Sequence, residues 1–190
     1  IKLNFNKNNL SISGNGKYFF DTEEDKISYK IKLINSNYEF DSEIQFNKNP
    51  LVIKILNYNK NENKNSSLKV KGVFKENKSL IFKKVLFEES ENKILIEELS
   101  LNKKFKINNI SNLELDIFNE NKKFNTISFK KNNENYELNG KIFDASILIN
   151  DILESESSDD ELSFFDNFNS NVIVKIEKTY IDKISNIKNL

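Results

Sequence analysis

The side chains of this chain that could do chemistry are carboxylates, lysines, hydroxyls and phenols, because the sequence contains no His, no Cys and no Arg. The commonest general base and the usual thiol nucleophile are therefore missing. Hydrolysis of a glycosidic bond needs only two carboxylates. The Asp and Glu residues here are spread over loops and polar strand faces, and no pair is set apart in apolar surroundings. We interpret them as solvated surface charge and predict neither catalytic residues nor a cofactor.

Two acidic stretches offer oxygen ligands that could bind a cation. They are DTEEDK (21–26) and SESSDDE (155–161). Neither stretch has the ligand spacing of a defined calcium loop, so the sequence predicts no metal site. SGNG (13–16) is too short for a phosphate-binding loop and lacks the helix that should follow one. It is predicted to be a turn.

The overall charge excludes one class of partner. The 29 Lys and 29 acidic residues cancel, and no basic stripe or Arg is available for a nucleic-acid backbone, so we expect no nucleic-acid partner. The abundance of Lys and Asn is interpreted as the codon usage of an AT-rich genome and carries no functional weight. The absence of Cys rules out disulfides and thiolate metal sites.

The elements that must position these side chains are mostly strands. In KISYKIKLIN (26–35) every second residue is apolar, and the same alternation recurs through most of the chain. A period of two with one wet face is typical of antiparallel sheet. The connections are short and rich in Asn, which favours hairpin turns. LIFKKVLF (80–87) and ILIEEL (94–99) have apolar residues on both faces and leave the orientation of their strands undecided.

One stretch breaks the alternation. In DASILINDILE (144–154), Asp144 can cap a first helical turn, and apolar residues follow at helical spacing. The predicted fold is all-β: an antiparallel meander that curves into a groove-like sheet, with one short helix near residues 144–153. We expect a single segment, 1–190, cut from a longer chain. Its predicted parts are a β meander (1–143), a short amphipathic helix (144–153), an acidic loop (154–161) and terminal strands (162–190).

Periodicity leaves two architectures open. In the first, the apolar strand faces pack against each other and fill an ordinary core, as in a sandwich or a closed barrel. In the second, the sheet stays open and its apolar face forms a trough that holds something apolar, such as lipid acyl chains. Lipid carriage needs no catalytic residue, so the missing chemistry suits both a conduit and a structural module.

The C-terminal part of the chain resembles a known family. LNGKIFDASILINDILES (138–155) and FFDNFNSNVIVKIEKTYIDKISNIKNL (164–190) are similar to a segment of the AsmA-like superfamily, the large envelope proteins of the AsmA, TamB and YhdP type in Gram-negative bacteria. In that pattern a strand with Gly140 leads to Asp144 and Ala145, then to a short helix and a strand of the form V-x-V-x-I-x-K. The family has Arg where this chain has Lys178. The resemblance covers roughly the last 55 residues.

The resemblance implies a function. Such proteins are anchored in the inner membrane by an N-terminal helix, and a long periplasmic β groove is thought to carry phospholipids toward the outer membrane. They are not enzymes. The expected partners are phospholipid acyl chains and adjoining β modules of the same polypeptide, with the membrane anchor outside this segment. The residues predicted to face the groove are Ile27, Tyr29, Ile31, Leu33, Phe40, Phe46, Phe74, Leu113, Leu115 and Ile117.

Two alternatives accompany this hypothesis. One is a structural or adhesive β module of a bacterial surface protein, with a filled core and partners on its loops. The other is an enzyme that acts on polysaccharide through two carboxylates. In the lipid-transport hypothesis the short helix has one of two expected roles. It covers an edge or mouth of the open sheet, or it marks the passage from one module to the next.

Overall fold

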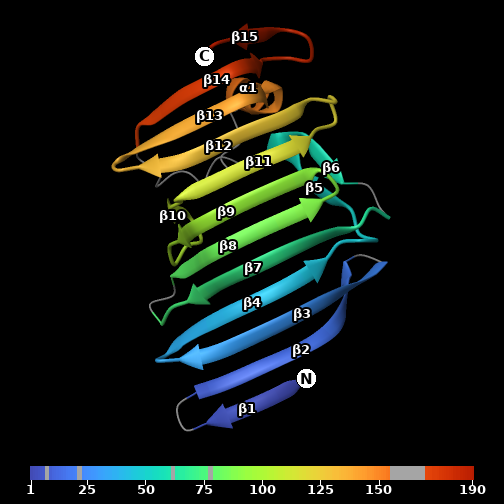
Figure 1. Cartoon of the computed structure of the whole chain (residues 1–190), viewed down its shortest axis with the longest axis vertical. Coiled ribbons are helices and arrows are strands. Elements are labelled where there is room, and N and C mark those ends of the chain that lie inside the picture. The colour runs from blue at the N-terminus through green and yellow to red at the C-terminus, as the bar shows by residue number, and fades with distance from the viewer. Residues whose placement is uncertain (7–8, 21–22, 61–62, 77–78, 155–169) are drawn as a thin grey trace.

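A computed structural model describes residues 1–6, 9–20, 23–60, 63–76, 79–154 and 170–190. Within these residues the fold is all-β, and one open sheet of 13 strands dominates it. The prediction of an all-β fold with one short helix is confirmed. The strands follow one another across the sheet in chain order, so the N-terminus and the C-terminus lie at opposite ends of the molecule (Figure 1).

The elements have the following bounds. The large sheet contains β1 (Lys2–Asn6), β2 (Asn9–Phe20), β3 (Glu23–Ile34), β4 (Asn37–Gln45), β7 (Ser66–Phe74), β8 (Leu80–Glu89), β9 (Asn92–Leu101), β10 (Ile107–Asn109), β11 (Asn112–Phe118), β12 (Phe124–Asn132), β13 (Asn135–Asp144), β14 (Val172–Tyr180) and β15 (Asn186–Lys188). A second, two-stranded sheet contains β5 (Leu51–Ile53) and β6 (Tyr58–Lys60), which are joined by the 3-10 turn η1 (Lys54–Leu56). The α-helix is α1 (Ser146–Glu154).

Most neighbouring strands are antiparallel because tight turns join them. Asn35 and Ser36 between β3 and β4 both have positive φ, and so do Ser90 between β8 and β9 and Asn133 between β12 and β13. Short polar residues tolerate this left-handed conformation better than bulky ones do. The Asn-rich connections therefore produce the predicted hairpins.

The helix lies in a crossover between two strands of the large sheet. β13 and β14 are parallel neighbours, and β15 follows them at the outer side. Parallel strands cannot be joined by a tight turn, so the chain has to travel back along the sheet before β14 begins. The backbone N–H of Ser146 donates to the Asp144 carboxylate, which confirms the predicted capping residue. Ile147 of the helix lies beside Val52 and Tyr58 of the small sheet. The expectation that the helix covers an edge or mouth of the open sheet, or marks the passage to a next module, stays a prediction.

Irregular backbone positions explain why alternation did not show which face the side chains of residues 80–87 and 94–99 point to. Lys83 is an extra residue in β8 relative to β7, and Glu98 in β9 has a φ of 50°. A bulge moves the following side chains to the other face, so apolar residues appear on both parities in the sequence. Residues 13–16, predicted to be a turn, lie instead inside the long strand β2. Residues 155–161 of the predicted acidic loop, and 162–169 of the predicted terminal strands, lie outside the described residues.

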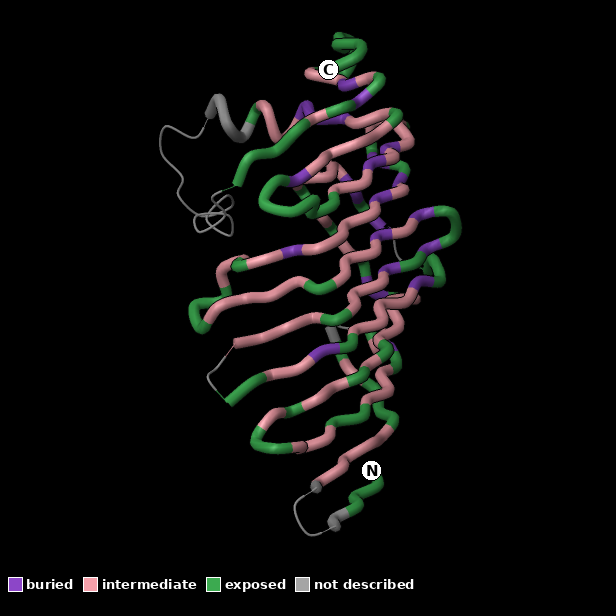
Figure 2. Tube along the Cα trace, turned by 60° about the vertical axis from the view of Figure 1, so that its left-hand side comes forward, coloured by how far each residue is buried: buried purple, intermediate pink, exposed green. Residues whose placement is uncertain are grey.

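The core lies under the small sheet. Tyr58 of β6 packs with Phe87, Ile94, Leu115 and Ile117 of the large sheet, and Leu51, Ile53 and Leu56 join this cluster. We call residues 46–65, which contain β5, η1 and β6, the cover segment. It leaves the large sheet after β4 and returns to it at β7. Figure 2 shows that most buried residues lie toward the C-terminal part of the sheet, whereas the N-terminal strands carry few.

Candidate functional site

The apolar face of the large sheet is built from rows of directly opposed residues. Because opposed residues of neighbouring strands share a face, the register assigns each row to one side. We name the two rows farthest from the cover segment the outer rows. The first contains Leu10, Leu33, Tyr38, Phe74, Leu80, Leu101 and Ile107. The second contains Leu3, Ile12, Ile31, Phe40, Gly72, Phe82 and Leu99.

The outer rows, together with Ile27, Tyr29 and Ile44 of the next two rows, form what we call the open face. None of the apolar side chains on it is fully buried within the described part of the chain. Leu3 is 64% exposed, Tyr38 47% and Ile31 36%. A monomeric soluble domain rarely leaves so continuous an apolar surface in water. The open face is therefore the candidate binding site.

Phe40 and Phe82 form the centre of the open face. Their ring centroids lie 6.0 Å apart in an edge-to-face arrangement. Gly72 stands between them in the row, and a Cβ at that position would lie 2.5 Å from the Phe40 ring and 2.4 Å from the carbonyl oxygen of Ile81. A glycine is therefore required for the Phe40 ring to lie over this strand. The result is a pair of aromatic rings that face each other across Gly72.

The predicted groove residues divide into three groups. Ile27, Tyr29, Ile31, Leu33, Phe40 and Phe74 all lie on the open face. Phe46 lies at its side, where its ring packs edge-on against Tyr18 with a centroid distance of 6.1 Å. Leu113, Leu115 and Ile117 share the same sheet face but lie under the cover segment.

The burial of the third group limits what these residues can bind. Leu115 is 1% exposed and Ile117 is not exposed at all, while Leu113 is half-buried against the same cluster. Their partners are side chains of this chain, so Leu115 and Ile117 are not accessible to a ligand in this conformation. The single apolar face thus contains both architectures that periodicity left open: a filled core at one end and an uncovered surface at the other.

A buried carboxylate attaches the start of the cover segment to the sheet. Asp25 of β3 accepts the backbone N–H groups of Asn47, Lys48 and Asn49, and the Asn49 side-chain amide donates to it at 2.8 Å. Burial alone would raise the pKa of the Asp25 carboxyl, but these four donors outweigh it and hold the pKa below its ordinary value. The DTEEDK stretch therefore supplies an anchor for the cover segment. The Asp25 carboxylate uses its oxygens to accept hydrogen bonds from that segment.

A second buried carboxylate attaches the middle of the cover segment. Glu89 of β8 accepts hydrogen bonds from the Tyr58 hydroxyl and from the Asn92 amide. The ammonium of Lys64 lies 3.5 Å from the same carboxylate. Burial opposes ionisation of Glu89, but these donors and the lysine charge lower its pKa below the ordinary value. Burial and the neighbouring Glu89 charge raise the pKa of Tyr58, so the phenol stays protonated.

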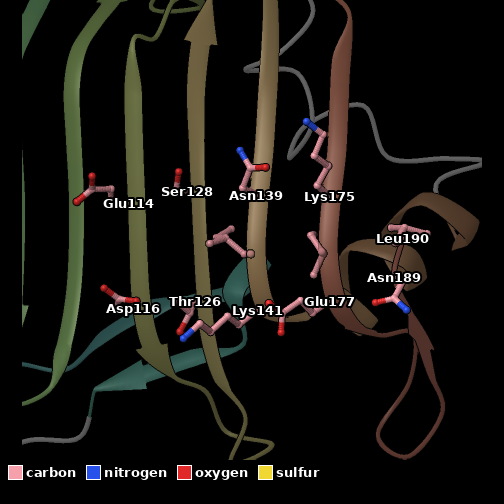
Figure 3. Close-up of a pocket in the computed structure, with 13 residues that line it drawn as sticks. Glu114, Asp116, Thr126, Ser128, Asn139, Lys141, Lys175, Glu177, Asn189 and Leu190 are labelled. Atoms are coloured by element: carbon pink, nitrogen blue, oxygen red, sulfur yellow. The ribbon is translucent and has the colours of Figure 1, made fainter.

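The opposite face of the sheet is mostly polar, although Val73, Ile81, Leu86 and Leu95 also belong to it. Over β11 to β14 it is hollowed, with a volume of about 690 Å³. Figure 3 shows its side chains in two ranks across the strands. The first rank is Glu114, Ser128, Asn139 and Lys175, and the second is Asp116, Thr126, Lys141 and Glu177. Ser128 and Thr126 are the small side chains within the two ranks, and Ile127, Ile176 and Leu190 add apolar surface to the lining.

Several members of the open face escaped the sequence prediction. Leu80, Phe82, Leu99 and Leu101 belong to the strands that contain the bulge, so their side could not be assigned from alternation. Leu10 and Ile12 begin β2, where two glycines interrupt the apolar pattern. Leu3 and Ile107 lie in the short strands β1 and β10 and were missed as well. Tyr38 and Ile44 alternate in phase with Phe40 in YEFDSEI (38–44), and that signal was sufficient to find them.

Other kinds of site are not formed by the described residues. They contain no group of three or more carboxylates placed to hold a metal ion. No helix in the described part of the chain is long and apolar enough to cross a membrane. No protein-family model matches the chain, and neither does any curated protein or any solved structure.

Proposed function

We propose that this chain is a segment of a bridge-like lipid transport protein and that its open face carries phospholipid acyl chains. The observation that carries the proposal is the open face itself, where an apolar surface continues across the N-terminal strands without a covering layer of described residues. The transport is passive in this proposal: acyl chains lie against the outer rows while headgroups stay in water. No step requires a catalytic residue.

The dimensions of the open face support an acyl chain as its occupant. Six neighbouring strands, β1 to β4 with β7 and β8, span about 24 Å at the usual strand spacing. The hydrocarbon core of a bilayer is about 30 Å thick, so the chains of one leaflet extend about 15 Å. An extended acyl chain therefore fits along one row, across the strands.

The two faces of the sheet differ in the way that a conduit needs. On the polar face, Lys71 pairs with Asp41 at 3.0 Å and Lys69 with Glu88 at 3.3 Å, each across neighbouring strands. Such exposed pairs contribute little to stability, but they keep this face in water. The continuous rows of apolar residues lie on the open face, so the proposal assigns the apolar ligand to that side of the sheet.

The resemblance to AsmA-like proteins supplies the rest of the proposal. In this proposal the segment lies in the periplasm, as part of a protein of the inner membrane that moves phospholipid toward the outer membrane. The adjoining β modules would extend the same sheet at its ends, where β1 and β15 are the outermost strands. The chain then acts as one section of a longer conduit and not as an enzyme.

A structural or adhesive module is the second candidate. The observation that favours it is the core under the cover segment, where Phe87, Leu115 and Ile117 are packed as in an ordinary domain. In that case the open face would bind another protein surface and hold no lipid.

The deciding experiment is native mass spectrometry of the purified chain, followed by organic extraction and lipid analysis. The test variant is Ile31→Asp, which places a charge in the middle of the open face beside Ile12 and Phe40. The matched control is Ser13→Asp, which adds the same charge on the polar face between Lys2 and Lys30. Circular dichroism and a urea titration verify that both variants fold.

We expect phospholipid to copurify with the original chain and with Ser13→Asp, and to be lost from Ile31→Asp. Tyr38→Asp is a second test variant at a more exposed position of the same face, in case Ile31→Asp does not fold. A lipid-free mass for the original chain, without binding of a hydrophobic dye, would overturn the proposal and favour the adhesive module.

A further inference from the structure

One loop at the side of the sheet presents an aromatic ring to solvent among lysines. The segment Asn102–Lys106 joins β9 to β10 and has the sequence NKKFK. Phe105 is 57% exposed, and Lys103 and Lys104 are exposed as well. Neither Lys103 nor Lys104 forms an ion pair within the described part of the chain.

Hydrogen bonds define the backbone of this loop. Asn102 makes four hydrogen bonds with the rest of the loop. Its backbone N–H donates to the Lys106 carbonyl at 3.0 Å, and its own carbonyl accepts from Phe105 at 2.9 Å. Its side-chain oxygen accepts from the N–H groups of Lys104 at 2.8 Å and Lys106 at 3.2 Å. The tip therefore holds Phe105 outward in a defined turn.

The turn itself does not require an aromatic residue. Phe105 has a φ of 59°, a left-handed conformation that is costly for a bulky side chain. The connection between β11 and β12 makes the same turn: Asn119 bonds to Lys123 and Lys122 as Asn102 bonds to Lys106 and Phe105. The left-handed position there is occupied by Lys122, with a φ of 56°. The turn can therefore form without an aromatic residue, so the folding of the loop does not explain why an exposed Phe stands at position 105.

The surroundings of the loop indicate which surface it fits. Leu101 and Ile107, which flank it, belong to the first outer row of the open face. Lys131 lies beside β10, with its ammonium 2.6 Å from the Asn109 side chain. Three exposed acidic residues lie on neighbouring segments: Glu76 between β7 and β8, Glu98 in β9 and Glu134 between β12 and β13. The loop itself, at the side of the sheet near β10 (Figure 1), has three lysines and no acidic residue, so its tip is basic.

From this geometry we propose that the Asn102–Lys106 loop docks on an anionic lipid bilayer, with Phe105 inserted at the interface and the lysines over the headgroups. Aromatic rings favour the boundary between headgroups and hydrocarbon, and lysines near an anionic surface are attracted by its negative potential. The inference is separate from the proposed function, since Phe105, Lys103 and Lys104 do not belong to the open face. If both hold, the loop brings the end of an outer row to the membrane surface.

Tryptophan at position 105 reports insertion directly. The chain contains no Trp, so Phe105→Trp gives a single fluorophore at the loop tip. The Phe105→Trp variant is mixed with vesicles of phosphatidylcholine alone and with vesicles that contain about one-third phosphatidylglycerol. We expect a blue shift of the emission, and quenching by brominated acyl chains, only with the anionic vesicles. High salt should reverse both effects, because it screens exposed charges.

Vesicle cosedimentation then compares variants of the loop. Phe105→Asn removes the ring and replaces it with a residue that tolerates a positive φ, so the turn is kept. We expect it to weaken binding to anionic vesicles about tenfold or more, since the transfer of a Phe side chain is lost. The double variant Lys103→Glu/Lys104→Glu should weaken binding at least about 25-fold, because each lysine contributes about fivefold.

The controls separate docking by the loop from other modes of binding. Lys122→Asn makes the matched change at the equivalent position of the other loop, and Phe19→Ala removes another exposed ring, which is 68% exposed. Both should bind within about twofold of the original chain. Ile31→Asp should also bind normally, whereas binding through the open face would be lost in it.

Three results would overturn the inference. They are an unshifted Phe105→Trp emission with anionic vesicles, equal binding of Phe105→Asn, and equal binding to neutral and anionic vesicles. Loss of copurified lipid in Ile31→Asp, with vesicle binding retained, would support both proposals separately.

Discussion

The Tyr58 hydroxyl donates a hydrogen bond to the buried carboxylate of Glu89 and thereby joins the small sheet to the large one. The two residues are 31 positions apart in the chain. The Tyr58 ring also packs edge-on against Phe87, with a centroid distance of 5.9 Å. One side chain thus contributes to the core and to the polar anchor of the cover segment.

Removing the hydroxyl should cost stability without opening a cavity. Tyr58→Phe keeps the ring against Phe87 but leaves the Glu89 carboxylate with one donor fewer in a buried position. We expect a loss of about 1–3 kcal/mol in the free energy of unfolding, measured by urea titration. Tyr38→Phe is the control, since Tyr38 is 47% exposed on the open face, and it should change stability by less than about 0.5 kcal/mol. Equal effects of the two changes would contradict the anchoring role.

The chain should lose stability in acid because three buried carboxylates are ionised in the folded state. The pKa values of Asp25, Glu89 and Asp144 are all lowered: burial opposes their ionisation, but hydrogen-bond donors outweigh it. A lowered folded pKa contributes stability that is present above the unfolded pKa and lost as the pH falls through the folded one. The free energy of unfolding should therefore begin to fall below about pH 4.5, near the ordinary pKa of a glutamate carboxyl.

This acid dependence can be assigned to the anchors of the cover segment. The double variant Asp25→Asn/Glu89→Gln removes two of the three groups and should have a shallower slope of stability against pH in urea titrations between about pH 3 and 6. Glu43→Gln is the control, since that side chain is exposed on β4 and lies outside the cover anchors. A slope unchanged in the double variant would show that other groups control the acid transition.

The two ends of the apolar face should respond differently to the same charge. Leu115→Asp buries an unpaired carboxylate in the core and should cost several kcal/mol, or unfold the chain. Ile31→Asp places its charge where the side chain is 36% exposed and should leave a cooperative unfolding transition. Differential scanning calorimetry of both variants measures the contrast. A loss of stability as large for Ile31→Asp would mean that the open face is covered in solution.

The aromatic centre of the open face should depend on one glycine. In Gly72→Ala the new Cβ would meet the Ile81 carbonyl at 2.4 Å, so the backbone or the Phe40 ring must move. We expect a loss of about 1–3 kcal/mol, as for other overpacked sites. Gly16→Ala is the control on β2, because its Cβ would meet only Ile27, at an ordinary 3.8 Å. That change should be neutral or stabilise by up to about 1 kcal/mol through the unfolded state.

Strand alternation in the sequence was sufficient to predict the fold class and the apolar side of the uninterrupted strands. In β3 and β4 the residues alternate without interruption, and Ile27, Tyr29, Ile31, Leu33 and Phe40 all lie on the predicted side. Alternation is a local property of the chain, so it needs no knowledge of neighbouring strands. The capping role of Asp144 was predictable for the same reason, since a cap involves only the next few residues.

Which part of that face is covered was decided by tertiary structure alone. Leu115 and Ile31 occupy equivalent places in alternating strands, yet one lies in the core and the other on the open face. The difference arises because the cover segment folds back over β8 to β12 through contacts between residues far apart in the chain, such as Tyr58 with Glu89 and Asn49 with Asp25. Local periodicity contains no information on such contacts, and the parallel pairing of β13 with β14 is of the same kind. The sequence by itself determined an amphipathic antiparallel sheet, and long-range packing decided where that sheet encloses a core and where it remains open.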